Sequence, residues 1–230
     1  MPAGTDNSRD ELRRRTLVRS LRSAYTDALL AGDPARAETV VRDAIDAGLS
    51  QAAIDEEVVA PAMRRVGELW EAGAISVADE HLATEISMRV LALQREAFRV
   101  AQRRARHTVL LAAVQGERHV IGLRMAGNLL TAAGYDVRCL GADVPVDALG
   151  AIAARLMPAV VGLTVTMAEF APLLPETIAT VQRTDPPAAV VVGGTGVPDL
   201  LRESAAVARC RSVVEVVETV DALVQRAATN

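Results

Sequence analysis

Residues 108–122 read Thr-Val-Leu-Leu-Ala-Ala-Val-Gln-Gly-Glu-Arg-His-Val-Ile-Gly, and this stretch decides the fold. Residues 108–114 form an unbroken, mainly apolar run, which is typical of a strand covered on both faces of a parallel sheet. A loop that contains glycine follows, and helical spacing of apolar residues begins near residue 120. The chain therefore passes here from a buried strand through a short loop into a helix, as alternating α/β folds do.

The same alternation continues along the rest of the chain. Further apolar runs stand at residues 135–140, 159–166 and 188–192, with a weaker run at 211–214. Helices are expected between and after these runs, at residues 120–133, 146–156, 170–183, 198–207 and 219–228. Residues 106–230 are thus predicted to form a five-stranded parallel sheet of the flavodoxin or Rossmann type, with helices on both faces.

Ligands of such sheets bind beyond the carboxyl ends of the strands. The loops at that edge are expected at residues 115–119, 141–145, 164–169 and 193–198.

The first part of the chain, residues 1–105, is patterned differently and predicts a four-helix bundle. Leu17, Leu21 and Leu29 recur at helical spacing after a polar stretch of roughly fifteen residues. A second helix is expected at residues 34–47, a third at 51–71 with a kink at Pro61, and a fourth from residue 77 to about 104. The fold class is therefore α followed by α/β, with the boundary around residues 105–107.

Composition and charge narrow the function classes. Half of the 230 residues are apolar and the formal net charge is −4, which favours a packed globular protein and argues against nucleic-acid binding. No apolar run approaches the roughly 20 residues that span a bilayer, and the first ten residues lack the apolar segment of a secretory signal. A cytoplasmic protein is expected.

The usual ligands of this sheet type are excluded by the loop after the first predicted strand. Residues 115–122 lack the GxGxxG pattern of dinucleotide-binding domains, and the chain has no GxxxxGK[ST] pattern for nucleoside triphosphates. A phosphoacceptor receiver domain would need an aspartate after its third strand, where this chain has residues 163–167, Leu-Thr-Val-Thr-Met.

Three polar or glycine-containing motifs stand at the predicted carboxyl ends of the strands. They are Glu117-x-His119-x-x-Gly122, Thr164-x-Thr166 and Gly193-Gly194. Each motif alone is better explained by an ordinary helix start or turn. Their coincidence at one edge of the sheet favours a slot for a long polar ligand, with an imidazole at its mouth.

This half of the chain resembles the B12-binding domain of methionine synthases, corrinoid proteins and cobalamin-dependent mutases. That family shows DxHxxG, then SxL or a similar pair, then GG, and it binds cobalamin with the nucleotide base displaced from cobalt. The resemblance implies that His119 is the lower ligand of cobalt and that Glu117 orients it. Glu117 stands where the family usually has aspartate.

The same resemblance assigns roles to the remaining motifs. Gly122 completes the histidine motif, and Thr164 and Thr166 are expected to contact the displaced cobalamin tail. Gly193 and Gly194 are expected to make room for that tail beside the sheet.

A second set of residues lies in the helical part. Trp70 is the only tryptophan of the chain, and Val77, Glu80 and His81 follow it at the start of the fourth predicted helix, where they can share one face. A core tryptophan beside helix-start carboxylates is the alternative interpretation.

The W-x9-EH pattern resembles the bundle of the CarH-like adenosylcobalamin photoreceptors. The resemblance implies that Trp70 and Val77 shield the adenosyl group, that Glu80 hydrogen-bonds its polar edge, and that His81 lies behind the residues that contact this group. Glu71 stands where that family can place a histidine directly after the tryptophan.

The resemblance implies a photosensory or regulatory protein, not an enzyme, that binds cobalamin, most readily adenosylcobalamin. Light-induced cleavage of the cobalt–carbon bond is expected to change its conformation or assembly. A homo-oligomer and an unknown effector protein or domain are expected, because the polar stretch before the first helix is too short for the DNA-binding domain of the CarH-like regulators. Direct DNA binding and membrane association are not expected.

Two other functions stay open from the sequence. One is a corrinoid methyl carrier of a methyltransferase system, which shares the histidine and the bundle. The other is a regulatory α/β module without a cofactor.

Overall fold

The computed structural model describes residues 4–97 and 107–229. The chain divides into two compact units, which meet in sequence between Gln94 and Arg95. Most of the predicted boundary at residues 105–107, and the predicted end of the fourth helix near residue 104, lie outside the described residues.

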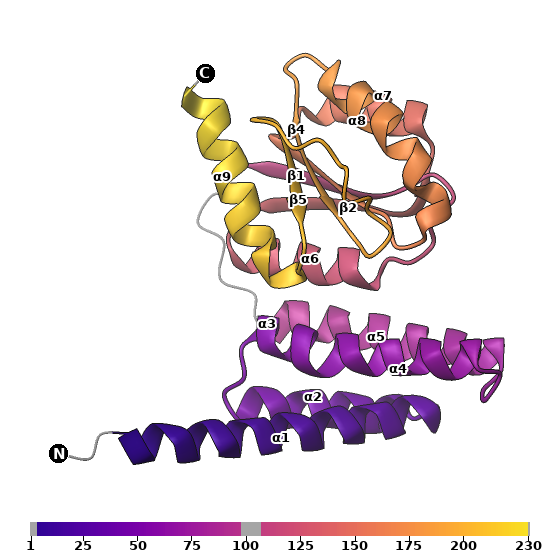
Figure 1. Ribbon diagram of the computed structural model, residues 1–230, viewed down its shortest axis with the longest axis vertical. Coiled ribbons are helices and arrows are strands. Elements are labelled where there is room, and N and C mark those ends of the chain that lie inside the picture. Colours follow the sequence, from indigo (N-terminus) through magenta and orange to yellow (C-terminus); the bar gives the residue numbers. More distant parts are fainter. Residues whose placement is uncertain (1–3, 98–106, 230) are drawn as a thin grey trace. The chain divides into compact units, whose positions relative to one another are not determined.

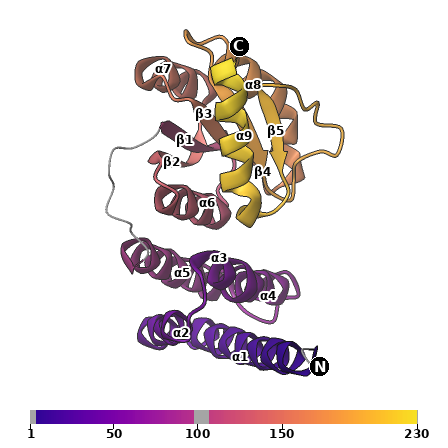
Figure 2. The same ribbon diagram turned by 90° about the vertical axis from the view of Figure 1, so that its left-hand side faces the viewer.

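The first unit is helical, as predicted. Its elements are α1 (Gly4–Leu30), α2 (Pro34–Asp46), α3 (Gln51–Ile54), the π-helical turn η1 (Asp55–Val59), α4 (Ala60–Glu71) and α5 (Val77–Ala97). Within this unit, α1 and α2 form one layer and the segment α3–α4 lies with α5 in the other (Figures 1 and 2). The core between the layers includes Tyr25, Leu29, Ile54 and Leu91, all fully or almost fully buried.

The first helix begins earlier than predicted. It starts at Gly4, so the polar stretch before residue 16 belongs to the helix and is not an extended leader. Charged side chains on this stretch pair along the helix, as Arg15 does with Glu11 at 2.8 Å. Pairs four residues apart stabilise an exposed helix without any apolar residue, which is why apolar spacing alone missed this segment.

The predicted kink at Pro61 takes the form of a π-helical turn, which lies just before Pro61 at Asp55–Val59. Pro61 has no N–H to donate to the carbonyl of Glu57, and its ring crowds that carbonyl. The helix widens over Asp55–Val59, where the Ala60 N–H donates to the Asp55 carbonyl. The Glu57 carbonyl accepts instead from Nε of Arg22 on α1, at 2.7 Å.

The second unit is the predicted five-stranded parallel sheet. Its strands are β1 (Thr108–Val114), β2 (Asp136–Val144), β3 (Val160–Thr164), β4 (Ala189–Gly193) and β5 (Val207–Cys210), in the order β2-β1-β3-β4-β5. The helices are α6 (Ile121–Ala132), α7 (Val146–Leu156), α8 (Leu174–Gln182) and α9 (Val216–Thr229), with 3₁₀ turns η2 (Ala168–Leu173) and η3 (Val213–Glu215). Helices α6 and α9 cover one face of the sheet, and α7 and α8 cover the other (Figures 1 and 2).

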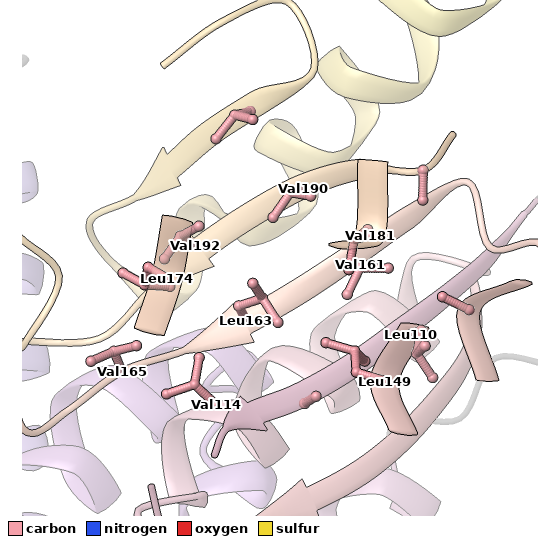
Figure 3. Close-up of a cluster of buried hydrophobic side chains, with 14 of the residues drawn as sticks. Leu110, Val114, Leu149, Val161, Leu163, Val165, Leu174, Val181, Val190 and Val192 are labelled. Carbon is pink, nitrogen blue, oxygen red and sulfur yellow. The ribbon is translucent and has the colours of Figure 1, made fainter. Parts of the chain in front are cut away.

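Coverage on both faces explains why the strands read as unbroken apolar runs. Alternate residues of β1, β3 and β4 point toward α7 and α8 and form one buried cluster (Figure 3). Its labelled members are Leu110, Val114, Leu149, Val161, Leu163, Val165, Leu174, Val181, Val190 and Val192. Every one of them is at most 4% exposed, so the middle of the sheet is well packed.

Two predictions for this unit are wrong. The helix expected at 198–207 is absent, and the last strand is Val207–Cys210, not residues 211–214. The side chain of Arg209 explains the first difference, because its guanidinium donates to the carbonyls of Val197 and Pro198 and to the Asp199 carboxylate. These contacts hold residues 197–199 in an irregular conformation.

A third prediction is also wrong: residues 141–144, expected as a loop, belong to β2. The strand continues because it bulges, as a shift in its pairing with β1 shows. Gly141 and Asp143 adopt positive φ angles there, of 91° and 50°.

Among the helices formed by the described residues, none is long and apolar enough to cross a membrane.

Candidate functional site

The loop between β1 and α6 carries a buried carboxylate at its centre. The side chain of Glu117 has no exposed surface. Its Oε1 accepts from the backbone N–H of His119 at 2.9 Å and lies 2.6 Å from Nδ1 of the same residue. Its Oε2 accepts from the backbone N–H groups of Thr166 and Met167, at 2.7 and 2.9 Å. One side chain thus joins the loop after β1 to the loop after β3.

These contacts determine the charge of Glu117. Burial by itself raises the pKa of this carboxyl, but the hydrogen bonds from His119, Met167 and Thr166 together outweigh burial and hold the pKa below its ordinary value. The carboxylate is therefore ionised at neutral pH. An ionised acceptor beside Nδ1 favours the His119 tautomer that carries its proton on that nitrogen.

The imidazole of His119 is turned outward. Its side chain is 58% exposed, although its partner Glu117 is fully buried. Because Nδ1 faces Glu117, Nε2 is the ring nitrogen directed away from it and suited to bind a metal. A histidine held through its other nitrogen by a carboxylate is the common arrangement of a metal ligand.

Gly122 lies in the first turn of α6, close to His119 in sequence. A Cβ atom added there would meet no heavy atom within 4 Å. Gly122 itself is therefore not required by packing within this unit.

Thr164 and Thr166 lie at and beyond the end of β3, as predicted. Thr164 is 8% exposed and is paired in register with Ala113 of β1 and Gly193 of β4. Thr166 is half-buried, and its carbonyl accepts from the hydroxyl of Thr195 at 3.1 Å. Both lie at the edge that carries His119, and their contact with a cobalamin tail stays a prediction.

The two glycines after β4 have different surroundings. A Cβ on Gly194, whose φ is +108°, would lie 2.1 Å from the Val165 carbonyl oxygen, so only glycine fits there. A Cβ on Gly193 would be 3.6 Å from the nearest atom, which is an ordinary contact. Gly194 is thus required for backbone packing, and the predicted role of both glycines in making room for a ligand stays a prediction.

Sequence reasoning missed two residues that shape this loop. Asp143 of β2 accepts from the Gly116 N–H at 2.7 Å and donates its own N–H to the Glu117 carbonyl at 2.8 Å. The ring of Phe170 lies where a Cβ on Gly116 would come within 2.5 Å of it. No local signal reveals these contacts, since Asp143 and Phe170 lie far from residue 116 in the chain.

The predicted capping residues lie in the helical unit, around the connection between α4 and α5. Trp70 is 45% exposed and Val77 is 51% exposed, which rules out the alternative of a core tryptophan. Glu80 lies 2.6 Å from Nδ1 of His81 and accepts from the hydroxyl of Thr84 at 2.9 Å. This part of the unit therefore offers exposed apolar surface together with a carboxylate whose position is supported by two neighbours.

Two family models, each described as a B12 binding domain, match residues 21–94 and 107–224. The second match alone covers about half of the chain, and the chain therefore belongs to the family of B12-binding proteins. The predicted resemblance is confirmed at this level, and cobalamin binding is the function that it supports.

Individual relatives fall into two groups. The HTH-type transcriptional repressor CarH of Myxococcus xanthus is 35% identical over 144 residues, which are 61% of this chain and 47% of the relative. Trimethylamine corrinoid protein 1 of Methanosarcina acetivorans is 27% identical over 144 residues, which are 61% of this chain and 66% of that one. The chain thus spans about half the length of the first relative and about two thirds of the second.

A solved structure shares the fold. The monomethylamine corrinoid protein of Methanosarcina barkeri matches 87% of this chain and 97% of its own length, with a TM-score of 0.73 and 18% identity. At this identity the match shows the order of a helical part and a Rossmann-like sheet, as predicted.

The residues at the sheet edge fit cobalamin. His119, whose side chain is 58% exposed, would hold cobalt through Nε2, and Glu117 would keep the ring in the right tautomer.

Proposed function

We propose that the chain is a light-responsive regulatory protein that binds adenosylcobalamin and acts as a sensor, not as an enzyme. When bound, this cofactor supplies a cobalt–carbon bond that light breaks, and the protein supplies orientation and readout. His119 would ligate the lower face of cobalt. The set Trp70, Val77 and Glu80, of which the first two are exposed, would cover the upper ligand.

The observation that carries this proposal is the character of that set. Trp70 and Val77 are large apolar side chains that are about half exposed, so both are accessible to a ligand. An indole offers a flat face for a nucleobase, and Glu80, held by His81 and Thr84, offers an acceptor for ribose hydroxyls or an amino group. An adenosyl group has both a flat base and polar edges, whereas a methyl group has neither.

The CarH relative also supports the proposal, beside the W-x9-EH pattern by which this chain resembles the CarH-like photoreceptors. We further propose that the chain forms a homo-oligomer whose assembly changes when the adenosyl group leaves. A partner protein or a further domain would receive the signal.

A corrinoid methyl carrier is the second candidate, favoured by the relatives named as corrinoid proteins and by the shared fold. Such a carrier needs an upper face that partner enzymes can reach, and Trp70 would then act only as a movable cover. Methyl transfer from bound methylcobalamin to a thiol or folate acceptor would favour this candidate.

The test compares absorption spectra and size-exclusion profiles of the protein saturated with adenosylcobalamin, in the dark and after green light. We expect a spectrum with histidine on cobalt that changes on illumination, together with a changed elution volume. Binding without any light-dependent change in elution would contradict a light-driven assembly switch and favour the methyl carrier.

Trp70→Ala tests the role of the cap. We expect this variant to bind hydroxocobalamin as the wild type does but to lose much of its preference for adenosylcobalamin. Leu30→Ala is the matched control, since Leu30 is 41% exposed and Trp70 45% exposed in the same unit. Equal preference in Trp70→Ala and wild type would exclude Trp70 from the adenosyl site.

A further inference from the structure

The turn at residues 115–117 directly precedes His119, and it is held from both neighbouring strands. In the order β2-β1-β3, the strand β1 that leads into this turn lies between β2 and β3. On the β3 side, the Glu117 carboxylate accepts from the Thr166 and Met167 N–H groups. The β2 side offers a second and independent attachment, through Asp143.

Asp143 and the turn make a reciprocal pair of hydrogen bonds. The Asp143 Oδ1 atom accepts from the Gly116 N–H at 2.7 Å. The Asp143 N–H donates to the carbonyl of Glu117 at 2.8 Å. Two backbone groups on either side of the Gly116–Glu117 peptide unit are thus held by one residue of the neighbouring strand.

A bulge in β2 brings Asp143 into this position. Ala112 is paired with Gly141 and Val114 with Val144, so β2 has one more residue than β1 over the same interval. Bulges of this kind re-aim a side chain. Asp143 itself has a φ of 50°, a left-handed conformation that aspartate and asparagine tolerate better than most residues.

The ring of Phe170 also packs against the turn. Gly116 has a φ of +86°, and the ring of Phe170 occupies the space where its Cβ would lie. The ring of Phe170 therefore limits movement of the turn toward it, and movement away from Asp143 or from the loop after β3 would break hydrogen bonds.

We infer that Asp143 is a positioning residue for the lower cobalt ligand: it holds the Gly116–Glu117 turn so that His119 is presented at a fixed place. This inference rests on the proposed ligation of cobalt by His119. Asp143 acts only through the backbone of the turn and is not itself a ligand. Without its side chain, the turn keeps the Glu117 attachment and the bond from the Asp143 N–H, but the Gly116 N–H loses its acceptor on the β2 side.

Two substitutions separate the hydrogen bond from the backbone conformation. Asp143→Gly removes the acceptor but tolerates the positive φ, whereas Asp143→Asn keeps both an acceptor oxygen and tolerance of the left-handed region. The first readout is hydrogen exchange of the Gly116 amide in the ligand-free protein. The second is the ratio of histidine-bound to histidine-free cobalamin in the absorption spectrum, with His119→Ala as the reference for the free form.

We expect faster exchange at Gly116 in Asp143→Gly and a ratio lowered about three- to tenfold, as for the loss of one ordinary hydrogen bond. Asp143→Asn should resemble the wild type in both readouts. A purely structural role would lower the free energy of unfolding, measured in urea, without changing the ratio. If Asp143→Gly fails to fold, Asp143→Ser, with a shorter acceptor, takes its place with the same expectations.

The outcomes distinguish this inference from the proposed function. Histidine-bound cobalamin in the wild type, with an unchanged ratio and unchanged Gly116 exchange in folded Asp143→Gly, overturns the inference alone. A wild-type spectrum identical to that of His119→Ala overturns both, because there would then be no ligation for Asp143 to support.

Discussion

Glu117 shows how one methylene changes the reach of a carboxylate. The related families usually have aspartate at this position, and here the longer side chain contacts His119 with one oxygen and the loop after β3 with the other. Each carboxylate oxygen of Glu117 has two hydrogen-bond partners, so neither oxygen is left unpaired although the side chain is fully buried. The residue therefore contributes to the fold as well as to the imidazole.

Glu117→Gln should lower the free energy of unfolding by about 2–3 kcal/mol, because an amide nitrogen would face N–H donors in a buried place. Urea unfolding of the ligand-free protein measures this loss. Glu176→Gln, the same change at an exposed residue of α8, serves as the control and should cost only tenths of a kcal/mol. Equal stability of the two variants would contradict the part assigned to Glu117.

Gly193 and Gly194 offer a pair of neighbouring substitutions with opposite expectations. Gly194→Ala should destabilise the protein by about 2–4 kcal/mol, since its Cβ would collide with the Val165 backbone and its φ is positive. Gly193→Ala should cost less than about 1 kcal/mol, because the nearest atom is at an ordinary distance.

The same pair tests the predicted cobalamin tail. If the tail passes beside Gly193, the stable Gly193→Ala variant should bind cobalamin more weakly than the wild type in an equilibrium titration. Unchanged affinity would remove Gly193 from the candidate site.

The π-helical turn η1 places a carboxylate in the core of the helical unit. Asp55 has no exposed surface, and no described protein group hydrogen-bonds either of its carboxylate oxygens. Burial raises the pKa of Asp55 to about 7, and the nearby amide of Gln94 on α5 lowers it only in part. The hydroxyl of Tyr25 on α1 donates to that of Ser87 at 3.1 Å, and burial, together with the Asp55 charge, raises the Tyr25 pKa to about 12.

A buried carboxyl of this kind makes stability depend on pH in a defined direction. The folded-state pKa of about 7 lies above the ordinary value of 3.8, so the folded protein holds the proton more tightly than the unfolded chain. Its contribution to stability is full below about pH 4 and is lost as the pH rises toward 7.

Asp55→Asn should remove this dependence. The difference in the free energy of unfolding between variant and wild type should grow from pH 4 to pH 7 in favour of the variant, to on the order of 2–4 kcal/mol. Urea titrations of both proteins at several pH values give the difference directly. Parallel pH profiles would show that Asp55 is ionised in the folded protein.

The molecule as a whole consists of two units, each with its own apolar core. The proposed site takes His119 from the sheet unit and Trp70 from the helical unit. Under this proposal, the complete cofactor should stabilise residues of both units.

Calorimetry provides the corresponding prediction. The ligand-free protein should unfold in two transitions, and hydroxocobalamin at a hundred times its Kd should stabilise mainly the sheet unit, by about 2.7 kcal/mol. Adenosylcobalamin in the dark should raise both transitions, since its adenosyl group would contact the helical unit. A shift of the same single transition by both ligands would contradict a shared adenosyl site.

Prediction from the sequence succeeded where a local pattern and the tertiary environment agree. The run at 108–114 is a strand because both faces of β1 are covered, and the helix at 146–156 matches α7 residue for residue. It failed at 198–207, where helix-favouring residues such as Leu200 and Leu201 are overruled by the carbonyl contacts of Arg209. It also failed at 141–144, where a bulge keeps β2 paired beyond its apolar run.

The chemistry of the candidate site was readable from the sequence, because the Glu117–His119 spacing and the end of a predicted strand are both local features. Local spacing also placed Trp70 before the turn that begins α5, as the structure has it. The sequence by itself determined the alternation of elements, the edge of the sheet that carries the polar motifs and the identity of the imidazole.

Only the tertiary structure decided how that imidazole is held. Asp143, Phe170 and the N–H groups of Thr166 and Met167 reach the turn from other strands and loops, far away in the chain. Periodicity and propensity describe neighbours along the chain, whereas a hydrogen bond depends on which segments fold side by side and in which register. The bulge that turns Asp143 toward Gly116 exists only because β1 and β2 are paired. A local sequence pattern therefore cannot predict it.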